Sequence, residues 1–298
     1  MELRGSFVAI ATPFDGGRFD KKSFTDLVEF QIENGTAGIV PCGTTGESAT
    51  LDHDEHVEVV RACMEAARGR VPVIAGTGSN STAEAITLTR AAQDLGADAA
   101  LLITPYYNKP PQEGLFEHYM AVANATDIPL VVYNCPGRTT GSISPDTLAR
   151  LAEHPNIQAV KDATGDLDWT TEVAMKTDLT ILSGDDTATL PTMAIGATGV
   201  ISVVANLMPA ENARMCEAAL KGDATEARRL HELLFALTKL LFSETSPIPV
   251  KTALHMMGRI GPELRLPLCA MTEGGAEKLK AELDRLGLLK ASAAGATA

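Results

Sequence analysis

The amino-acid sequence predicts a (β/α)8 TIM barrel, followed by a C-terminal helical appendage. Short apolar runs recur along the first two thirds of the chain, each followed by a loop rich in Gly, Thr, Pro or Asn and then by a helical stretch. The runs are almost continuously apolar, which is typical of strands buried on both faces of a parallel sheet. Eight such units in a row favour a closed barrel over an open doubly wound sheet, which remains the alternative.

Eight strands are predicted where these apolar runs occur. In chain order they cover residues 7–11, 38–42, 71–75, 99–104, 128–133, 157–160, 179–183 and 199–203. Capping patterns predict helices between them. Ser81-x-x-Glu84 is the pattern of a capping box, and it opens a helix that Gly96 ends. Ser144-Pro145 is typical of an N-cap followed by proline at the first helical position.

The pattern changes after about residue 222. We therefore predict a barrel catalytic domain over residues 1–222 and a helical region over residues 223–298. A long amphipathic helix is expected over residues 223–242, and a proline-rich break at residues 246–249 precedes at least two more helices. The small residues of the tail, 291–298, predict disorder.

Composition excludes several classes of function. The 298 residues carry a formal net charge of −13, which disfavours nucleic acid and anionic membranes as partners. No apolar run is long enough to cross a bilayer, and the first residues do not resemble a signal peptide, so we expect a cytoplasmic location. The five cysteines are scattered without a C-x-x-C pair, as is typical of reduced thiols.

Lys161 is the first candidate for catalysis, because active sites of parallel barrels lie at the carboxyl ends of the strands. It follows the apolar run at residues 157–160, so its amine is expected inside the barrel mouth. Desolvation there lowers the pKa of a lysine and leaves a neutral, nucleophilic amine. The alternative is a lysine paired with Asp162 or another carboxylate, and position alone weights the two interpretations equally.

Other strand ends carry groups that suit an anionic substrate. Tyr133 ends a strand, where its phenol either relays protons or is a core tyrosine with a satisfied hydroxyl. The loop Gly43-Thr44-Thr45-Gly46 offers hydroxyls and backbone amides that can hold a carboxylate, although a plain turn explains it equally well. Arg138 is a candidate cation, but taken alone it is better explained as a surface arginine.

Metal and nucleotide motifs are incomplete. His53 and His56 lack the H-E-x-x-H spacing and a third ligand, so no metal site is predicted. Gly76-Thr77-Gly78 lacks the third glycine of a dinucleotide fingerprint, and no P-loop is present. We therefore expect chemistry without a metal or a bound cofactor.

Taken together, these residues resemble the pyruvate-dependent class I aldolase family over nearly the whole chain. The motifs that carry the resemblance are Gly43-Thr44-Thr45-Gly46-Glu47, Tyr106-Tyr107-Asn108, Tyr133-Asn134-x-Pro136-Gly137-Arg138-Thr139, Val160-Lys161-Asp162 and Gly199-Val200-Ile201-Ser202. The best match is the branch that condenses pyruvate with L-aspartate-4-semialdehyde in the first committed step toward diaminopimelate and lysine. Sialic-acid lyases and keto-deoxy-sugar aldolases generally lack the Pro-Gly-Arg. They remain an alternative, with a non-catalytic keto-acid-sensing barrel as the less favoured one.

The resemblance implies a covalent mechanism that needs no cofactor. Lys161 would form an imine with pyruvate and convert its methyl group into an enamine nucleophile. The implied proton relay consists of Tyr133, Thr44 and Tyr107, with Tyr107 reaching in from a neighbouring subunit. The family suggests a homotetramer made of two tight dimers.

Substrate contacts are implied in the same way. Thr45 and nearby amides would hold the pyruvate carboxylate, and Arg138 would bind the carboxylate of the semialdehyde. The backbone at Gly184 and Ile201 would line the site. One position departs from the family, because Ser246 stands where asparagine is usual.

A second group of residues matches the positions that bind feedback lysine in inhibitable members of the family. Carboxylate, phenol and amide groups suit an ammonium ligand, so an allosteric lysine site is the favoured hypothesis. For Glu84 alone, the capping box is a sufficient explanation. The seven residues are Ser48, Ala49, His53, His56, Asn80, Glu84 and Tyr106.

Overall fold

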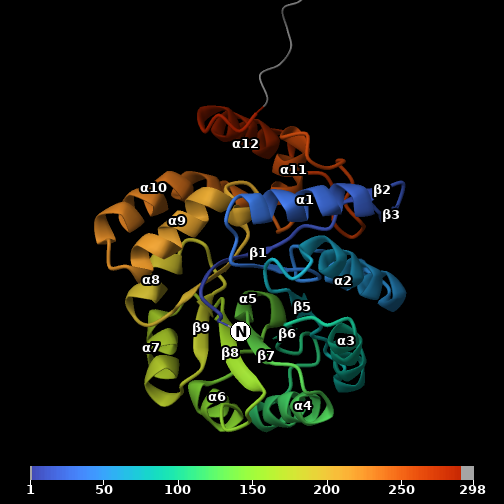
Figure 1. The fold of residues 1–298 in the computed structure, drawn as a ribbon, viewed down its shortest axis with the longest axis vertical. Coiled ribbons are helices and arrows are strands. Elements are labelled where there is room, and N and C mark those ends of the chain that lie inside the picture. Colours follow the sequence, from blue (N-terminus) through green and yellow to red (C-terminus); the bar gives the residue numbers. More distant parts are fainter. Residues whose placement is uncertain (1, 290–298) are drawn as a thin grey trace, which may run out of the picture.

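The computed structural model describes residues 2–289, which form a parallel barrel surrounded by helices (Figure 1). Its eight-stranded sheet has the order β4-β1-β10-β9-β8-β7-β6-β5, and every neighbouring pair is parallel. A parallel bridge between Ile39 and Val73 joins the two ends of this order and brings β4 beside β5. The predicted (β/α)8 barrel is therefore confirmed.

Each predicted run contains a strand, although the ends differ by up to three residues. The strands are β1 (Gly5–Ala9), β4 (Gly38–Val40), β5 (Ile74–Gly76), β6 (Ala99–Ile103), β7 (Leu130–Asn134), β8 (Ile157–Asp162), β9 (Thr180–Ser183) and β10 (Gly199–Ser202). The consequential difference is in β8, which continues past its apolar residues because its pairing with β7 and β9 extends to Asp162. Lys161 thus lies within a strand rather than after one.

Side chains alternate between the two faces of β8. Ala159 belongs to the cluster that fills the barrel interior, whereas Val160 packs in the layer between strands and helices. Successive strand residues point to opposite faces, so Lys161 points inward with Ala159, and Asp162 points outward with Val160. Tyr133 belongs to the same interior cluster as Ala159, so it also points into the barrel.

Helices form the outer layer of the barrel. They are α1 (Lys21–Glu33), α2 (His53–Ala67), α3 (Thr82–Asp94), α4 (Gln112–Ala125), α6 (Pro145–Leu151), α7 (Leu167–Lys176), α8 (Thr189–Ala194) and α9 (Pro209–Leu220). Ser144 caps α6 as predicted, since its hydroxyl accepts a hydrogen bond from the Thr147 amide at 3.1 Å.

The capping box predicted at α3 is only half formed. Ser81 is the N-cap and accepts from the Glu84 amide at 3.5 Å. The Glu84 carboxylate does not return to Ser81, because it is hydrogen-bonded to Ser79 and His53 instead. The Ser81 amide donates to the Ser79 hydroxyl at 3.0 Å. The reciprocal bond was therefore wrongly predicted, and this leaves the Glu84 carboxylate beside a cavity.

The C-terminal helices are α10 (Ala224–Leu241), α11 (Ile248–Met256) and α12 (Glu273–Arg285). Figure 1 shows α10 along α9, and α12 packs against α10 and α11. Apolar side chains of α10, α11 and α12 join the same core as the barrel strands β1 and β4. The helical region thus packs on the barrel, while the boundary at residue 222 stays a prediction. The tail at 291–298 lies outside the described residues.

Five short elements have no predicted counterpart. They are β2 (Phe14–Asp15), β3 (Arg18–Phe19), η1 (Ser48–Thr50), α5 (Pro136–Thr139) and η2 (Val204–Asn206). Because each spans only two to four residues, none has a detectable hydrophobic period. Two of them nevertheless bear on the site, since η1 and α5 contain residues that line its cavity.

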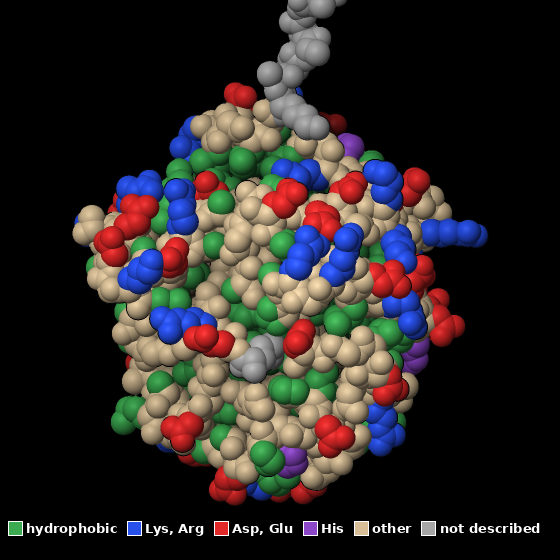
Figure 2. All heavy atoms as spheres, in the orientation of Figure 1, with side chains coloured by type: hydrophobic (Ala, Val, Ile, Leu, Met, Phe, Trp, Pro, Cys, Tyr) green, Lys and Arg blue, Asp and Glu red, His purple; other side chains and the backbone are tan. Residues whose placement is uncertain are grey.

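Acidic and basic side chains are interspersed over the face of the molecule in Figure 2, which shows no broad patch of one sign. None of the helices within the described residues has the length and apolar character needed to span a bilayer.

We predict that Gly199→Ala destabilises the barrel. A Cβ at Gly199 would lie 2.0 Å from the carbonyl oxygen of Gly5 on the neighbouring strand, so the backbones would have to separate. The expected loss is about 3 kcal/mol of unfolding free energy, measured by urea denaturation. Gly274→Ala, in open space in the first turn of α12, is the matched control and should be neutral or slightly stabilising. Equal stability of the two variants would contradict the prediction.

Candidate active site

Lys161 occupies the interior of the barrel at the carboxyl end of β8. Its register partners are Tyr133 on β7 and Leu182 on β9. The residue is 6% exposed, and its Nζ lies 4.2 Å from the centroid of the Tyr133 ring. No hydrogen bond or ion pair within residues 2–289 reaches this nitrogen.

The alternative of a Lys161–Asp162 pair is wrong, because the two side chains lie on opposite faces of β8. The Asp162 carboxylate accepts hydrogen bonds from the Thr164 hydroxyl at 2.7 Å and the Thr170 hydroxyl at 2.5 Å. Both threonines belong to the segment that leads into and forms α7. Asp162 therefore anchors the helix that follows the strand and leaves Lys161 unpaired.

The environment of Lys161 favours its neutral form. Burial lowers the pKa of this amine from 10.5 to about 8, and only part of the shift is opposed by Cys135 and Asp186. Roughly a tenth of an amine with such a pKa is unprotonated at pH 7, many times more than for a solvated lysine. The geometry thus supplies an unpaired amine that can attack a carbonyl carbon.

Gly184 lies beside the side chain of Lys161, and Ile201 belongs to the interior of the same barrel. A Cβ at Gly184 would be 2.9 Å from Cε of Lys161 and 2.9 Å from the Cβ of Ala163, so only glycine leaves room for the lysine side chain. Ile201 is 1% exposed and belongs to the interior cluster with Ala159. Gly184 thus shapes the space around Lys161, while a role of Ile201 in lining the site stays a prediction.

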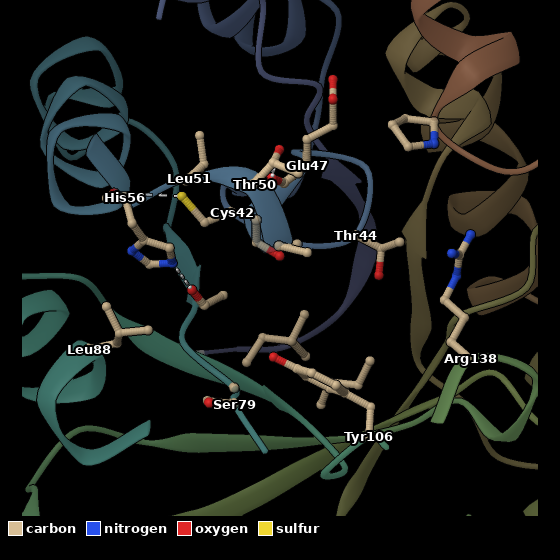
Figure 3. A pocket seen from close by; sticks show the side chains of 18 of the residues that line it. Cys42, Thr44, Glu47, Thr50, Leu51, His56, Ser79, Leu88, Tyr106 and Arg138 are labelled. Atoms are coloured by element: carbon tan, nitrogen blue, oxygen red, sulfur yellow. Dashed lines mark hydrogen bonds between the residues drawn. The ribbon is translucent and has the colours of Figure 1, made fainter. Parts of the chain in front are cut away.

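Tyr133 provides a phenol that stays protonated at neutral pH. Burial raises its pKa, the Cys135 thiol adds to the rise, and Arg138 and Thr44 act against it. Tyr133 and Thr44 line one cavity of about 870 Å³ together with Arg138. In Figure 3, Thr44 and Arg138 lie at one end of this cavity and His56 and Leu88 at the other.

The loop after β4 presents two amides to the site. Within the loop, the Gly46 amide donates to the Gly43 carbonyl and the Glu47 amide to the Thr44 carbonyl, each at 3.1 Å. In the described part of the chain, the amides of Thr44 and Thr45 have no hydrogen-bond acceptor. Free amides in a tight turn bind anions, so the observed turn favours the carboxylate-binding interpretation.

Arg138 sits at the last turn of α5 with its guanidinium at the rim of the cavity. It donates a hydrogen bond to the backbone carbonyl of Ser246 at 3.2 Å. Since this contact uses the main chain, it does not depend on the serine that replaces the usual asparagine. The guanidinium keeps further donors for an anion.

Tyr107 is not brought together with Tyr133 and Thr44 within one chain. It is 89% exposed and has a left-handed backbone conformation with φ of 71°. It does not line the cavity, whereas its neighbour Tyr106 does. A contribution of Tyr107 to a neighbouring subunit stays a prediction.

Six of the seven residues predicted to bind lysine line the far part of the same cavity. The seventh, Asn80, is not in the lining, but its side-chain amide donates to the Tyr106 carbonyl at 3.1 Å. The Glu84 carboxylate has a lowered pKa because Ser79 and His53 hydrogen-bond to it. The lining residues are Ser48, Ala49, His53, His56, Glu84 and Tyr106.

Sequence reasoning missed an ion pair at the barrel mouth, between Glu47 and Lys251. Glu47 stands in a motif that carries the family resemblance, but Lys251 stands outside those motifs, 204 residues away. The only signal in the sequence for this pair was that each charged residue stands among small or apolar neighbours.

No group of three or more His, Cys, Asp or Glu within residues 2–289 is arranged to hold a metal ion.

Comparisons with known proteins agree over nearly the whole chain. A family model described as "Dihydrodipicolinate synthetase family" matches residues 2–286. The 4-hydroxy-tetrahydrodipicolinate synthase of Thermodesulfovibrio yellowstonii is 54% identical over 290 residues, covering 97% of this chain and 100% of the relative. That of Geobacter sulfurreducens is 55% identical over 289 residues, covering 96% and 100%.

Solved structures give the same result. The dihydrodipicolinate synthase of Aquifex aeolicus is 48% identical with a TM-score of 0.96, covering 97% of this chain and 100% of that one. A pyruvate complex of the Acinetobacter baumannii enzyme is 48% identical with a TM-score of 0.94 and the same coverage. A lysine-bound structure from Cyanidioschyzon merolae is 40% identical with a TM-score of 0.93, covering 96% and 99%.

We predict that acylation of Lys161 by acetic anhydride is half-maximal near pH 8 and levels off by about pH 9 to 10. Only the neutral amine reacts, so the rate should rise with pH through the lowered pKa and then level off. Lys176, whose pKa is raised by Asp146, is the control and should still be gaining reactivity above pH 10. Peptide mass mapping after competitive labelling measures both. A Lys161 rate that keeps rising through pH 10 would show that its amine is not desolvated.

Proposed function

The chain belongs to the dihydrodipicolinate synthetase family, and we propose that its chemistry proceeds through an imine between Lys161 and pyruvate. The reaction is the condensation of pyruvate with L-aspartate-4-semialdehyde to give 4-hydroxy-tetrahydrodipicolinate, the first committed step toward diaminopimelate and lysine. One observation carries the proposed mechanism: the amine of Lys161 is buried, unpaired and shifted toward its neutral form.

The imine explains how the methyl group of pyruvate becomes a nucleophile. The neutral Nζ adds to the keto carbon, the keto oxygen leaves as water, and the resulting iminium withdraws electrons from the methyl group. Loss of a methyl proton gives an enamine, which forms the new carbon–carbon bond to the aldehyde. The amine of the acceptor then attacks the imine carbon, which closes the ring and frees Lys161. No bound cofactor takes part in this proposal.

Tyr133 and Thr44 are proposed to move protons during these steps. Tyr133 is the register partner of Lys161, and its raised pKa keeps a proton on the phenol at neutral pH. Thr44 lines the same cavity and interacts with that phenol. Tyr107 is proposed to complete the relay across an interface between subunits, in a homotetramer made of two tight dimers.

Anion binding is proposed at two places, because both substrates carry carboxylates. The free amides of Thr44 and Thr45 suit the pyruvate carboxylate, and Gly184 and Ile201 bound the space next to it. Arg138 is proposed to bind the carboxylate of the semialdehyde, since its guanidinium is held at the rim by the Ser246 carbonyl. In a chain of net charge −13, these local donors make an anionic substrate acceptable.

We predict that borohydride in the presence of pyruvate adds the mass of one reduced pyruvate to the chain, at Lys161. Reduction fixes the imine as a stable amine, and peptide mapping locates it. The Lys161→Ala variant should gain no mass, because it lacks the amine.

Arg138→Ala is the matched control for this trapping experiment. It should trap pyruvate as the wild type does but lose at least about tenfold in turnover with L-aspartate-4-semialdehyde, because one charged contact to the acceptor is absent. Absence of the adduct in the wild type, or cleavage of N-acetylneuraminate in place of this condensation, would refute the assignment.

Lysine is proposed as an inhibitor that binds in the far part of the cavity. A related structure is described as lysine-bound, and the positions predicted for such a site carry a carboxylate, hydroxyls and imidazoles in this chain. Glu84 is the group best suited to the ligand ammonium, because its pKa is lowered and it stays ionised.

We predict that Glu84→Gln weakens lysine binding about tenfold or more, since it removes the carboxylate charge while keeping the side-chain shape. Calorimetric titration measures the affinity. Glu113→Gln on α4, which disrupts an exposed ion pair with Arg150 on α6, should leave the affinity for lysine unchanged. If the wild type gives no heat and keeps its full activity at millimolar lysine, no such site exists.

A further inference from the structure

Glu47 and Lys251 form a buried ion pair that joins the barrel mouth to α11. Their side chains are 0% and 1% exposed. The second oxygen of Glu47, Oε2, accepts a hydrogen bond from the Arg265 amide at 3.1 Å. Lys251 Nζ lies 4.3 Å from the centroid of the Phe14 ring. Two segments of the C-terminal region are thus attached to one residue of the loop after β4.

Stability alone does not explain this pair. The cost of removing two charges from water offsets much of their attraction, and apolar side chains of similar size pack equally well in such places. Burial lowers the pKa of Lys251, and the neighbouring Glu47 opposes that shift, so Lys251 depends on its partner to stay charged. A buried pair of this kind fixes geometry better than it adds stability.

The geometry that the pair fixes is that of the loop at residues 42–47. Cys42 and Glu47, at its two ends, adopt left-handed conformations with φ of 54° and 53°. Residues other than glycine rarely adopt such angles unless their surroundings hold them there. Thr44 and Thr45 lie between these two points, and their free amides face no acceptor within residues 2–289.

The turn leaves little room for adjustment. The Glu47 amide donates to the Thr44 carbonyl at 3.1 Å, so a shift of Glu47 moves Thr44 directly. A Cβ at Gly46 would lie 3.1 Å from the Cys42 amide nitrogen and 3.1 Å from the Thr12 hydroxyl. The loop is therefore packed against its own start and held at its end by the carboxylate.

We propose that Glu47 and Lys251 are positioning residues that hold the amides of Thr44 and Thr45 in place for the pyruvate carboxylate. The inference rests on the proposed function, and it makes the C-terminal helical region part of the substrate site. Neither residue contacts the reacting atoms. They act through the backbone of the loop, so their removal weakens pyruvate binding without preventing imine formation.

The neighbouring Arg265 offers a matched control. Its guanidinium pairs with Glu55 on α2, at 2.6 Å between Nη2 and Oε1, and donates to the Thr50 and Gly17 carbonyls at 3.0 Å and 2.8 Å. Glu55→Gln breaks a partly buried ion pair in the same cluster without removing either partner of the Glu47 carboxylate, the Lys251 amine or the Arg265 amide. It therefore reports the effect of lost stability alone.

The test measures pyruvate trapping at Lys161 by borohydride as a function of pyruvate concentration, together with the melting temperature. Glu47→Gln should raise the half-saturating pyruvate concentration about tenfold and leave the yield at saturation unchanged, as expected when charge-assisted positioning of a binding group is lost. Glu55→Gln should lower the melting temperature but keep half-saturation within about twofold of the wild type.

A double variant covers the case in which Glu47→Gln does not fold. Glu47→Leu combined with Lys251→Met replaces both charges by apolar side chains, and it should fold but keep the raised half-saturation. Wild-type half-saturation in the Glu47 variants, or an equal rise in Glu55→Gln, would overturn the proposal. Failure of the wild type to trap pyruvate would refute the proposed function instead, so the two failures are distinguishable.

Discussion

The other features of the site depend on one constraint, the desolvation of the Lys161 amine inside a closed barrel. Closure of the sheet gives each strand an inner and an outer face, and Lys161 falls on the inner face between Tyr133 and Leu182. A charged ammonium is costly there, and no carboxylate pairs with it within residues 2–289. The same burial that disfavours its charge leaves a share of the amine neutral, as the proposed role of a nucleophile requires.

The anionic substrates impose the opposite requirement, because a dry site in an acidic protein repels carboxylates. We propose that local hydrogen-bond donors resolve this conflict. The amides of Thr44 and Thr45 supply positive dipoles without a full charge that would interact with Lys161, and Arg138 is kept at the rim. The Glu47–Lys251 pair lies outside the reacting centre, where its charges cancel each other. The charged groups around the site are therefore either paired, as in Glu47 and Lys251, or held at the rim, as in Arg138, away from the amine of Lys161.

Patterns of short range were reliable guides to this fold. Apolar runs located all eight strands, and Ser144-Pro145 located a helix start, because burial of a strand and satisfaction of a helix end depend on a few neighbouring residues. The Glu84 carboxylate was the exception. The capping box predicted a hydrogen bond from the Ser81 amide to this carboxylate, but the carboxylate is bonded to Ser79 and His53 instead. His53 is 31 residues away from Glu84 and comes close only through the packing of α2 and α3.

The sequence by itself determined the barrel, the candidate lysine and the residues next to it, since strand ends in a parallel barrel meet at one mouth. Tertiary structure alone decided between a paired and an unpaired Lys161, because the register of β8 against its neighbours sets the face to which each side chain points, and a one-residue shift in register would reverse it. It alone revealed the contact of Gly184 with Lys161 and the pairing of Glu47 with Lys251. These contacts join distant segments, and no local pattern specifies which distant residues become neighbours.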